Sequence, residues 1–575
     1  MLLLRTAVDL TKIKRGVAFL TGMLVVSTAS SAFCSTLNRP ADPVILTGAD
    51  VPSLTGAAPG NIVAFRYTGA WEQIPVQVDE RAVVNYNTVY KGSATWGGNF
   101  TRVSYTDSRT FTGGDPDPTL DADDEIVFMA KDGGSKMSSL IEPACVEPHS
   151  GVEIHVTDPL DSGEGYVYLF RQDGTLDPGA GTQYVEYAFN LLSGNYKTTY
   201  RVSDGPNPED TTITTACYAR HFADRWISDE IRIYAGGATG ADILDRHKNL
   251  FAPGVCSRSE DTFSDGEGAF ICNITGPVRA IRSYVGCNSG PLTQRDNIFY
   301  EQREDITTYL RVHAISGVMD FYDYSPAATG MTYYNNDTTG GVTIDGVPDT
   351  VTGGPIEWEL VTGVQGSLVM TRDVHTDIAT IHPTSYYLDD DTPAVTQCTG
   401  DAFAFGSSGT RIPQSIPNTD PALGAAYYLR VVHHTYYDAP GAVVSDTEEA
   451  LDLVNNPLEC TAGVWWDTDG DGVIDSDDAF PNNPAEWADT DGDGLGDNFE
   501  MRIINFDEFD AYRTLDDVLP GDDFDGDGVS NDREFQYGTD PTDPESQVLV
   551  STAAGTAVLV AAAFALIIKL SPRRA

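Results

Sequence analysis

The stretch NIVAFRY at residues 61–67 is followed, four residues later, by EQIPVQV at residues 72–78. Both are short runs of apolar or alternating side chains, and a glycine lies between them. Such runs, bounded by turn signals, predict β-strands. Runs of the same kind continue up to about residue 450: Glu125–Ala130, Val152–Val156, Tyr166–Phe170, Thr307–His313, Ser367–Arg372 and Ala426–His433. Helical periodicity is scarce there, so we predict that residues 41–450 form a mainly β, antiparallel, sandwich-type ectodomain, either one oversized sandwich or two smaller subdomains.

Beyond this region lie three aspartate ladders of twelve residues each. They read DTDGDGVIDSDD at 467–478, DTDGDGLGDNFE at 489–500 and DFDGDGVSNDRE at 523–534. A loop can supply Ca²⁺ with oxygens from positions 1, 3 and 5, a backbone carbonyl at position 7, position 9, and a carboxylate at position 12, with glycine at position 6. All three ladders match this template, which favours calcium sites over a flexible acidic linker.

The template assigns a complete ligand set to each loop. The predicted ligands are Asp467, Asp469, Asp471, Val473, Asp475 and Asp478 in loop 1; Asp489, Asp491, Asp493, Leu495, Asp497 and Glu500 in loop 2; and Asp523, Asp525, Asp527, Val529, Asn531 and Glu534 in loop 3. Val473, Leu495 and Val529 would contribute backbone carbonyls. Loop 1 ends in an aspartate, which is shorter than glutamate, so a bidentate closing contact is harder to make there.

The segment from residue 461 to residue 546 resembles the thrombospondin type 3 repeats of bacterial surface proteins. The resemblance rests on DTDGDGVIDSDDAFPNNPAEWADTDGDGLGDN and DFDGDGVSNDREFQYGTDPTDPES, and it implies structural calcium. Ordinary paired EF-hands are disfavoured because Pro481, Pro484 and Pro520 would cut their helices short. One short amphipathic helix is predicted between loops 2 and 3, from the apolar spacing of Phe499, Ile503, Phe506, Phe509, Tyr512 and Leu515.

The formal net charge of −50 is extreme, and about half of it falls between residues 450 and 547. This charge excludes nucleic acid as a partner. Most of the remaining carboxylates are expected to form a solvated surface, which needs no partner. The predicted partners are therefore calcium ions, together with an extracellular carbohydrate or protein ligand of the ectodomain.

Both ends of the chain carry sorting signals. Lys12, Lys14 and Arg15 precede an apolar stretch and a small-residue site ending at Ala32, so residues 1–32 are predicted to be a signal peptide. Residues 548–568 contain no charge and are long enough to cross a bilayer. The basic tail 569–575 would then face the cytoplasm. We predict an exported protein, at the cell surface or in the periplasm, that is anchored by a C-terminal transmembrane helix.

Eight cysteines are scattered along the chain without any Cys-x-x-Cys pair. In an exported protein this spacing favours structural disulfides over a zinc or redox site. The pairing cannot be deduced, and Cys256 with Cys272 is the first candidate.

An enzymatic alternative rests on two stretches. The first runs WEQIPVQVDE at 71–80 and then DPDPTLDADDEIVFMAKDGG at 115–134, and the second is GPVRAIRSYVGCNSGPLTQRDNIFYEQREDITTYLRVHAI at 276–315. Together they are similar to exported β-sandwich proteins with polysaccharide-lyase-like or mutarotase-like domains. Such an enzyme would need a base near an arginine; the residues considered are Arg279, Arg282, Tyr284, His433 and His434. Because adjacent strand residues point to opposite faces, only one of the two histidines could enter a given site.

No nucleophile elbow, metalloprotease helix or phosphate loop occurs in the sequence, so no residue is assigned to catalysis. The preferred prediction is a calcium-binding, membrane-anchored surface protein whose β-rich ectodomain binds or adheres. The alternative is an exported carbohydrate-active enzyme with structural calcium.

Overall fold

The computed structural model describes residues 35–91, 101–137, 141–197, 208–252, 259–264, 268–286, 293–310, 314–392, 399–401, 403–417, 429–471, 473–475, 477–507 and 511–546. The predicted signal peptide, the C-terminal span at 548–568 and the basic tail lie outside these ranges. Within them, no helix is both long enough and apolar enough to cross a bilayer.

The chain begins with a small β-sandwich. Its first sheet has the order β1 (Pro43–Thr47), β7 (Glu125–Met129), β4 (Gln77–Asp79), and its second has the order β27 (Glu459–Val464), β8 (Val152–Thr157), β9 (Glu164–Arg171), β2 (Ile62–Tyr67), β3 (Trp71–Ile74). Buried residues of both sheets, including Leu46, Ile62, Ile126 and Leu169, share one core. The edge strand β27 follows the whole of the large sandwich in the sequence, so the chain returns to this unit after leaving it.

The run predicted as one strand at 72–78 is two strands. β3 ends at Ile74 and joins the second sheet, whereas β4 starts at Gln77 and joins the first. Pro75 lies between them and has no N–H group to donate to a strand ladder. The proline therefore marks the point where the chain crosses from one layer to the other.

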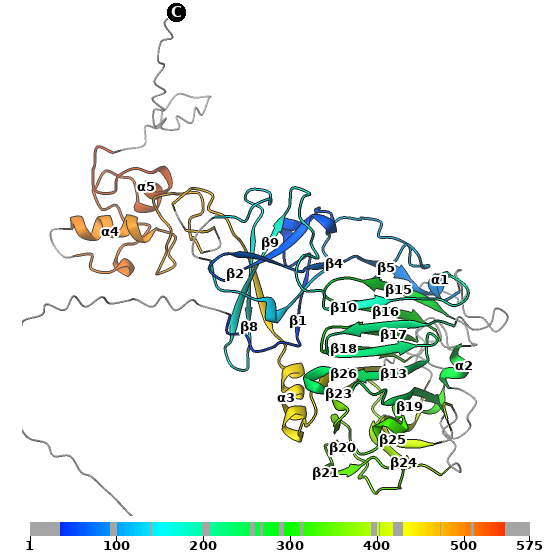
Figure 1. Cartoon of the computed structure of the whole chain (residues 1–575). Helices are drawn as coiled ribbons and strands as arrows, with labels where there is room; N and C mark the ends of the chain where they lie inside the picture. The colour runs from blue at the N-terminus through cyan, green and yellow to red at the C-terminus, as the bar shows by residue number, and fades with distance from the viewer. Residues whose placement is uncertain are drawn as a thin grey trace, which may run out of the picture.

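A much larger sandwich follows (Figure 1). One layer is a nine-stranded sheet: β15 (Ala269–Thr275), β16 (Ala280–Val285), β17 (Gln294–Phe299), β18 (Arg303–Tyr309), β26 (Leu429–Asp438), β23 (Gly366–Thr376), β22 (Trp358–Gly363), β20 (Thr332–Asn335) and β21 (Thr338–Thr343). Every pairing in this sheet is antiparallel. The prediction of a mainly β, antiparallel sandwich is confirmed.

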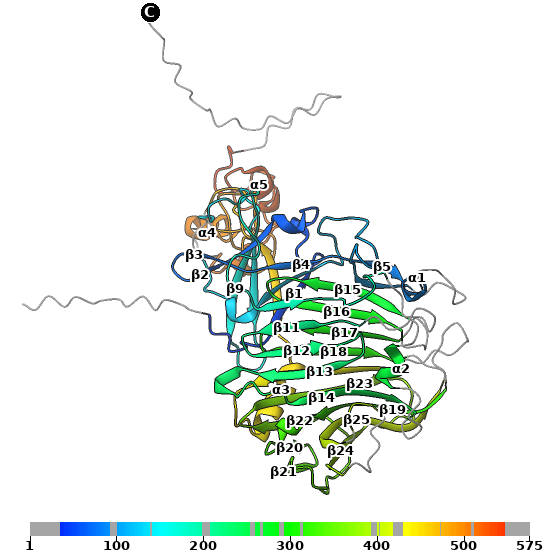
Figure 2. The ribbon, with the colours of Figure 1, turned by 45° about the vertical axis from the view of Figure 1, so that its right-hand side comes forward.

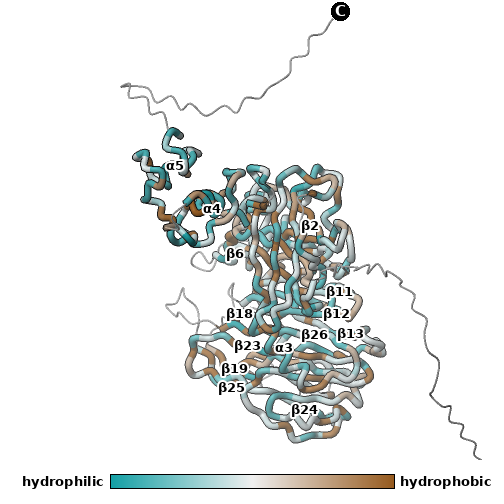
Figure 3. The backbone as a smooth tube through the Cα atoms, turned by 90° about the vertical axis from the view of Figure 1, so that its left-hand side faces the viewer, coloured by the Kyte–Doolittle hydropathy of each residue, from teal (hydrophilic) through white to brown (hydrophobic). Residues whose placement is uncertain are grey.

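Two four-stranded sheets lie edge to edge and form the other layer (Figure 2). They are β10 (Val185–Ala188), β11 (Thr211–Thr215), β12 (Tyr218–Phe222) and β13 (Ser228–Ile233), and β14 (Leu244–Phe251), β19 (Ile315–Tyr324), β25 (Ala404–Ile416) and β24 (Thr384–Asp390). Buried side chains from both layers, such as Tyr218, Ile231, Leu368 and Tyr437, pack between them. Apolar residues alternate with polar ones along the strands (Figure 3), as expected for sheets with one buried face.

Short elements cover the margins of the large sandwich. The hairpin of β5 (Arg81–Asn85) and β6 (Thr101–Tyr105) and the helix α1 (Tyr86–Lys91) pack beside β15 and β16. Helix α2 (Glu260–Ser264) contacts β14, and α3 (Val444–Asn455) packs on the outer face of β22 and β23. The 3₁₀ helices in the described part of the chain are Pro52–Leu54, Pro59–Asn61, Ala130–Asp132, Ala235–Gly237, Pro326–Ala328 and Leu515–Asp517.

The described residues of the C-terminal segment form two α-helices, α4 (Asp497–Phe506) and α5 (Asn531–Tyr537), where a single short helix was predicted. Helix α4 also ends earlier than its apolar spacing indicated. Asp507 follows it directly and accepts hydrogen bonds from the backbone N–H groups of Ala511 and Tyr512, which turns the chain away from the helix axis. Phe509 lies outside the described residues, and Leu515 belongs to a 3₁₀ turn.

The segment that carries the aspartate ladders is fixed to the small sandwich at its start. Trp465, 2% exposed, makes edge-to-face contacts with Trp71, Tyr168 and Phe170. Lys136 Nζ also lies 3.0 Å from Asp477 Oδ2 of loop 1. Helices α4 and α5 consequently stand at the end of the molecule formed by the small sandwich, opposite β20, β21 and β24 (Figures 1 and 2).

The disulfide prediction is wrong for the cysteines that the structure describes. Cys145, Cys217, Cys272 and Cys460 all carry free thiols. Cys272, the first candidate for a bond to Cys256, is fully buried in β15 among the apolar side chains of α1 and β16. Its packing as a small hydrophobic residue accounts for its burial without a disulfide.

Candidate functional site

The three predicted calcium loops share one backbone arrangement. In loop 2, Gly492 N–H donates to Asp489 Oδ1 at 2.8 Å, and Leu495 N–H donates to Asp493 Oδ1 at 2.9 Å. The equivalent bonds recur in loop 1 (Gly470 to Asp467, 2.6 Å; Val473 to Asp471, 2.8 Å) and in loop 3 (Gly526 to Asp523, 2.9 Å; Val529 to Asp527, 2.7 Å). The ladders are therefore ordered turns with a fixed geometry.

Glycine is required at two positions of these turns. Gly494 and Gly528, at position 6, have φ of 93° and 92°, which is the left-handed region that glycine occupies without strain. Gly492 and Gly526, at position 4, have φ of 76° and 77°. The template predicted the first pair but not the second, although the repeated Asp-Gly dipeptides signal such turns. Gly472 lies outside the described residues.

Within each loop, the aspartates at positions 1, 3 and 5 converge. One carboxylate oxygen from each lies within 4.8 Å of the others, in loops 1, 2 and 3 alike. The backbone bonds use only Oδ1 of the aspartates at positions 3 and 5, whereas Asp489 and Asp523 at position 1 accept with both oxygens. The second oxygen has no hydrogen-bond partner among the described residues at five of these aspartates: Asp469, Asp471, Asp493, Asp525 and Asp527. Three like charges at this separation repel one another unless a cation lies between them.

Loops 2 and 3 are closed by glutamates that the fold buries completely. Glu500 and Glu534 both have zero exposure. Neither oxygen of Glu500, and only Oε1 of Glu534, finds a hydrogen-bond partner in the described part of the chain. Burial, reinforced by the aspartates at positions 3 and 5, raises the pKa of Glu500 to about 8 and that of Glu534 to about 7. Unpaired buried carboxylates are costly, and a divalent cation with oxygen ligands would relieve that cost. The residues present thus fit Ca²⁺.

Loop 1 is the weakest of the three. Its closing residue, Asp478, is nearly buried, and its Oδ1 already accepts a hydrogen bond from Phe480 N–H at 2.7 Å. No helix begins among the described residues of this loop, whereas α4 and α5 begin at position 9 of loops 2 and 3. Loop 1 therefore lacks the fully buried glutamate, with at least one oxygen that has no described hydrogen-bond partner, that distinguishes the other two.

The residues at position 9 make hydrogen bonds that the calcium-loop template did not predict. In loop 2 both oxygens of Asp497 accept hydrogen bonds from Thr490, from N–H at 2.7 Å and from Oγ1 at 2.6 Å. Asp475 and Thr468 make the same two bonds in loop 1. These carboxylates brace the start of the loop, and the template did not predict the threonine at position 2 that donates both bonds. In loop 3, Asn531 is fully buried and its Oδ1 lacks a described partner.

A small apolar core holds loops 2 and 3 together. Leu495, Phe499, Ile503 and Val518 are buried in it, and Phe535 of α5 packs edge-to-face on Phe499 at 5.3 Å. Leu495 occupies position 7, and Phe499 immediately precedes the closing Glu500. The hydrophobic contacts therefore fix the same backbone that positions the carboxylates.

The residues considered for catalysis are mostly internal. Arg279 is fully buried and pairs with Asp79 and Glu125, which ties the large sandwich to the small one. Arg282 pairs with Glu209 at 2.6 Å, and Tyr284 packs edge-to-face on Trp226. These side chains are core contacts that support the fold.

A second polar cluster, which the sequence did not reveal, lies between the two layers of the large sandwich. His247 Nε2 is 2.5 Å from Asp320 Oδ1, and Arg295 pairs with the other oxygen of Asp320. Burial opposes ionisation of Asp320, but Arg295 and His247 outweigh it and lower the pKa of Asp320 well below its usual range. Burial lowers the pKa of His247 in spite of Asp320. The adjoining cavity, lined by Trp226 among others, measures about 20 Å³, which holds about one water.

The adjacent histidines of β26 face opposite sides of the nine-stranded sheet. His433 is buried in the interior, with its ring 5.6 Å from that of Tyr322. His434 lines a pocket of about 260 Å³ on the outer face, where its Nδ1 lies 2.5 Å from Asp305 Oδ1 and 3.1 Å from Arg303 Nη2. The expectation that only one of the pair can enter a given site is confirmed. This pocket is also lined by Asp42, Leu453 and Leu458.

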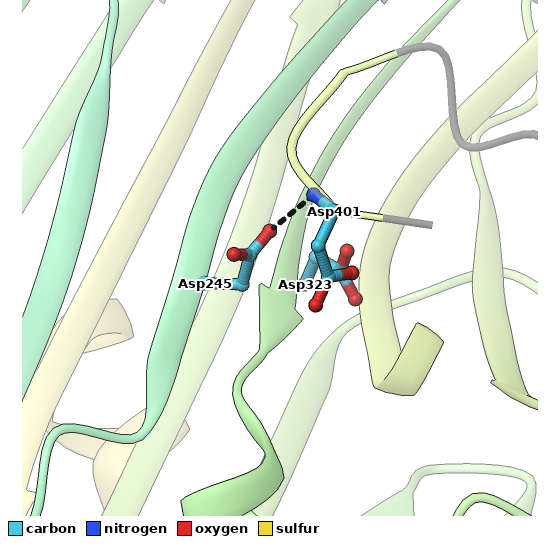
Figure 4. A group of neighbouring side chains, drawn as sticks. All are labelled: Asp245, Asp323 and Asp401. Carbon is cyan, nitrogen blue, oxygen red and sulfur yellow. Dashed lines mark hydrogen bonds between the residues drawn. The ribbon is translucent and has the colours of Figure 1, made fainter. Parts of the chain in front are cut away.

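A further group of carboxylates, Asp245, Asp323 and Asp401, gathers on the outer side of β14 and β19 (Figure 4). Asp401 N–H donates to Asp245 Oδ2 at 3.3 Å. Unlike the three predicted calcium loops, this group already holds a cation, because the ammonium of Lys248 contacts Asp323.

Comparison with known proteins leaves the family unassigned. No protein-family model and no curated protein matches the chain. Among solved structures, the crystal structure of the HI1317 protein is similar with a TM-score of 0.28 and 5% identity, covering 44% of this chain and 100% of that one. A putative aldose 1-epimerase from Escherichia coli K12 is similar with a TM-score of 0.25 and 9% identity, at the same coverage. Likenesses this distant establish no shared family.

Proposed function

We propose that this protein is a calcium-binding surface protein, in which residues 461–546 form thrombospondin type 3-like repeats and the β-rich ectodomain binds or adheres. The observation that carries the proposal is the buried pair Glu500 and Glu534, each closing a loop of three converging aspartates. Both oxygens of Glu500 and Oε2 of Glu534 have no hydrogen-bond partner among the described residues. Calcium would be held by these carboxylates and by the aspartates at positions 1, 3 and 5. It would neutralise their charge and fix the turns.

The calcium would be structural rather than regulatory. Trp465 attaches the repeat segment to the small sandwich, so a rigid segment would set the orientation of the whole ectodomain. The predicted span at 548–568 would place the repeats directly outside a membrane, where millimolar Ca²⁺ occupies even weak sites. Export, anchoring and an extracellular carbohydrate or protein ligand belong to this proposal.

Titration calorimetry on the whole chain, first stripped with chelator, tests calcium binding. We expect uptake of Ca²⁺ at loops 2 and 3 and a rise in melting temperature on binding. Glu500→Gln and Glu534→Gln should each abolish one site, because an amide cannot supply a bidentate carboxylate. Glu545→Gln, at an exposed position of the same segment, is the matched control. Absence of Ca²⁺ uptake by the stripped wild-type chain would contradict the proposal.

A carbohydrate-active enzyme is the second candidate, and the pocket of His434 favours it. An imidazole held by a carboxylate can act as a general base or acid, and Arg303 beside it would suit an anionic sugar. The chain should be screened against neutral and acidic polysaccharides for new reducing ends or unsaturated products. Activity that disappears in His434→Gln but survives in His375→Gln, at a partly exposed histidine of β23, would support this candidate. Absence of any product from the wild type would remove it.

A further inference from the structure

Lys248 of β14 and Asp323 of β19 form an ion pair in which neither side chain has any exposed surface. The two strands are adjacent and antiparallel, and Lys248 lies opposite Phe321 in their register. Lys248 and Asp323 are therefore diagonal neighbours on one face of the sheet. Lys248 Nζ contacts Asp323 Oδ2, which places the amine next to the carboxyl carbon. Fully buried lysines are rare, and this one is held against a single carboxyl group.

Two further side chains complete the arrangement around Asp323. Ser407 of β25 donates a hydrogen bond to Asp323 Oδ1 at 2.5 Å, so the two oxygens of this carboxyl group differ in their surroundings. A carboxylate oxygen of Asp245 lies within 4.8 Å of Asp323. Burial raises the pKa of both carboxyl groups, that of Asp323 to about 6. Proton-accepting and proton-donating groups therefore flank the amine and the carboxyl carbon.

The loop that carries Asp401 covers the pair. Gly400 has φ of 74°, and a Cβ atom at this position would lie 2.4 Å from Asp245 Oδ2 and 3.1 Å from Lys248 Cε. Only glycine allows the backbone to approach so closely. The cover excludes water from the pair, and exclusion of water favours condensation of an acid with an amine over hydrolysis of the product.

We propose that Lys248 and Asp323 condense into an intramolecular amide, a covalent cross-link between β14 and β19. Within the pair, a proton passes from the ammonium of Lys248 to the carboxylate of Asp323, giving an amine and a carboxylic acid. The lone pair of Nζ then attacks Cγ and forms the new C–N bond. Ser407 stabilises the developing charge on Oδ1, which becomes the amide oxygen. The bond from Cγ to Oδ2 breaks, Asp245 relays the surplus proton of Nζ to the departing oxygen, and one water leaves.

The step balances without any oxidant, reductant or cofactor, because an amine and a carboxylic acid give one amide and one water. Two features of the site favour it. The reacting groups are held in contact by the sheet, which replaces a bimolecular encounter by a unimolecular one. Condensation also removes two buried charges, whose desolvation opposes the ion pair.

Peptide mapping of the purified full-length chain by mass spectrometry tests the proposal. We expect trypsin to leave Lys248 uncut and to release a branched peptide that joins the segments of Lys248 and Asp323. Its mass should be smaller than the sum of the two segments by one water. In Asp323→Asn the same branched peptide should form with loss of one ammonia, since the side-chain amide can be displaced by the same amine.

Lys248→Arg keeps the charge but removes the nucleophilic amine, so this variant should yield two separate peptides. Lys131→Arg, in a partly exposed lysine–glutamate pair, is the matched control and should retain the branched peptide. Separate wild-type peptides of unmodified mass, cleaved after Lys248, would overturn the proposal. A metal ion retained at Asp245 and Asp323 with unmodified peptide masses would overturn it equally. The wild-type map decides the question even if a variant fails to fold.

Discussion

His433 and His434 are consecutive in β26, yet the nine-stranded sheet separates them: His433 lies in the interior against Tyr322, and His434 pairs with Asp305 on the outer face. Burial lowers the pKa of His433 well below its usual value, so its imidazole is neutral. The two histidines therefore have different roles, a packed core residue and a pocket residue.

This separation predicts unequal effects of alanine substitution on stability. His433→Ala should lower the free energy of unfolding by about 2–3 kcal/mol, because it empties a buried site. His434→Ala should cost about 1 kcal/mol or less, because Arg303 still pairs with Asp305. Urea unfolding of the two variants measures the difference. A larger loss in His434→Ala than in His433→Ala would contradict the assignment.

Among the acidic residues of the large sandwich, we expect substitution of Asp320 to cause the largest loss of stability. Asp320→Asn would leave Arg295 without the charge that compensates its burial, at a cost of about 3–5 kcal/mol. Asp373→Asn, at an exposed position that pairs only with a partly exposed histidine, should change stability by less than about 0.5 kcal/mol. Equal unfolding midpoints for the two variants would argue against a buried ion cluster.

Trp465 should fix the repeat segment to the small sandwich. Trp465→Ala removes a buried indole from a cluster of aromatic rings and should cost about 3–5 kcal/mol. Trp487→Ala removes a side chain of a residue that is 44% exposed and should be nearly neutral. Thermal and urea unfolding of both variants, in the presence of Ca²⁺, provide the measurement. The prediction fails if the small sandwich unfolds at the wild-type midpoint without Trp465.

We expect the protein to lose stability at alkaline pH as His221 loses its proton. Hydrogen bonds to Asp229 and Asp210 raise its pKa to about 9, although partial burial opposes them. Since the folded-state pKa lies above the unfolded value, the stabilisation is complete below about pH 6.5 and is lost as pH rises through 9. The loss should be about 1–2 kcal/mol, because Asp210 is solvent-exposed.

The free energy of unfolding, measured as a function of pH, tests this expectation. Between pH 7 and 10 the free energy of unfolding of His221→Gln should fall less than that of the wild type. In His382→Gln, at an exposed position, the profile should be unchanged. A wild-type stability that rises over this range would show that His221 does not behave as expected.

Thr490 should tune calcium affinity in loop 2 without being a ligand. Thr490→Val removes the hydroxyl that braces Asp497, a loss of about 1 kcal/mol and so roughly five-fold in affinity. Thr468→Val should weaken loop 1 in the same way and leave loop 2 untouched. Site-resolved calorimetry distinguishes the two variants. Unchanged binding in both would show that position 9 needs no bracing.

The sequence by itself determined the class of fold and the positions of the three aspartate ladders, because both depend on local pattern. Alternating runs place strands wherever one face is buried, and twelve-residue spacing places three aspartates around one point whatever surrounds the loop. Two further features are visible in the sequence but were not used in the prediction. Pro75 interrupts the run that was predicted as one strand, and the glycines at position 4 of the loops are not part of the calcium-loop template.

Tertiary structure decided what depends on contacts between distant strands. The pairing of Lys248 with Asp323 and that of His247 with Asp320 each join strands more than 70 residues apart, and no spacing in the sequence brings them together. The burial of Glu500 and Glu534 likewise depends on the core formed by α4 and α5. The alternation of apolar and polar residues determines which face of a strand a side chain occupies. Only tertiary packing determines which residues that side chain contacts and whether water can reach it.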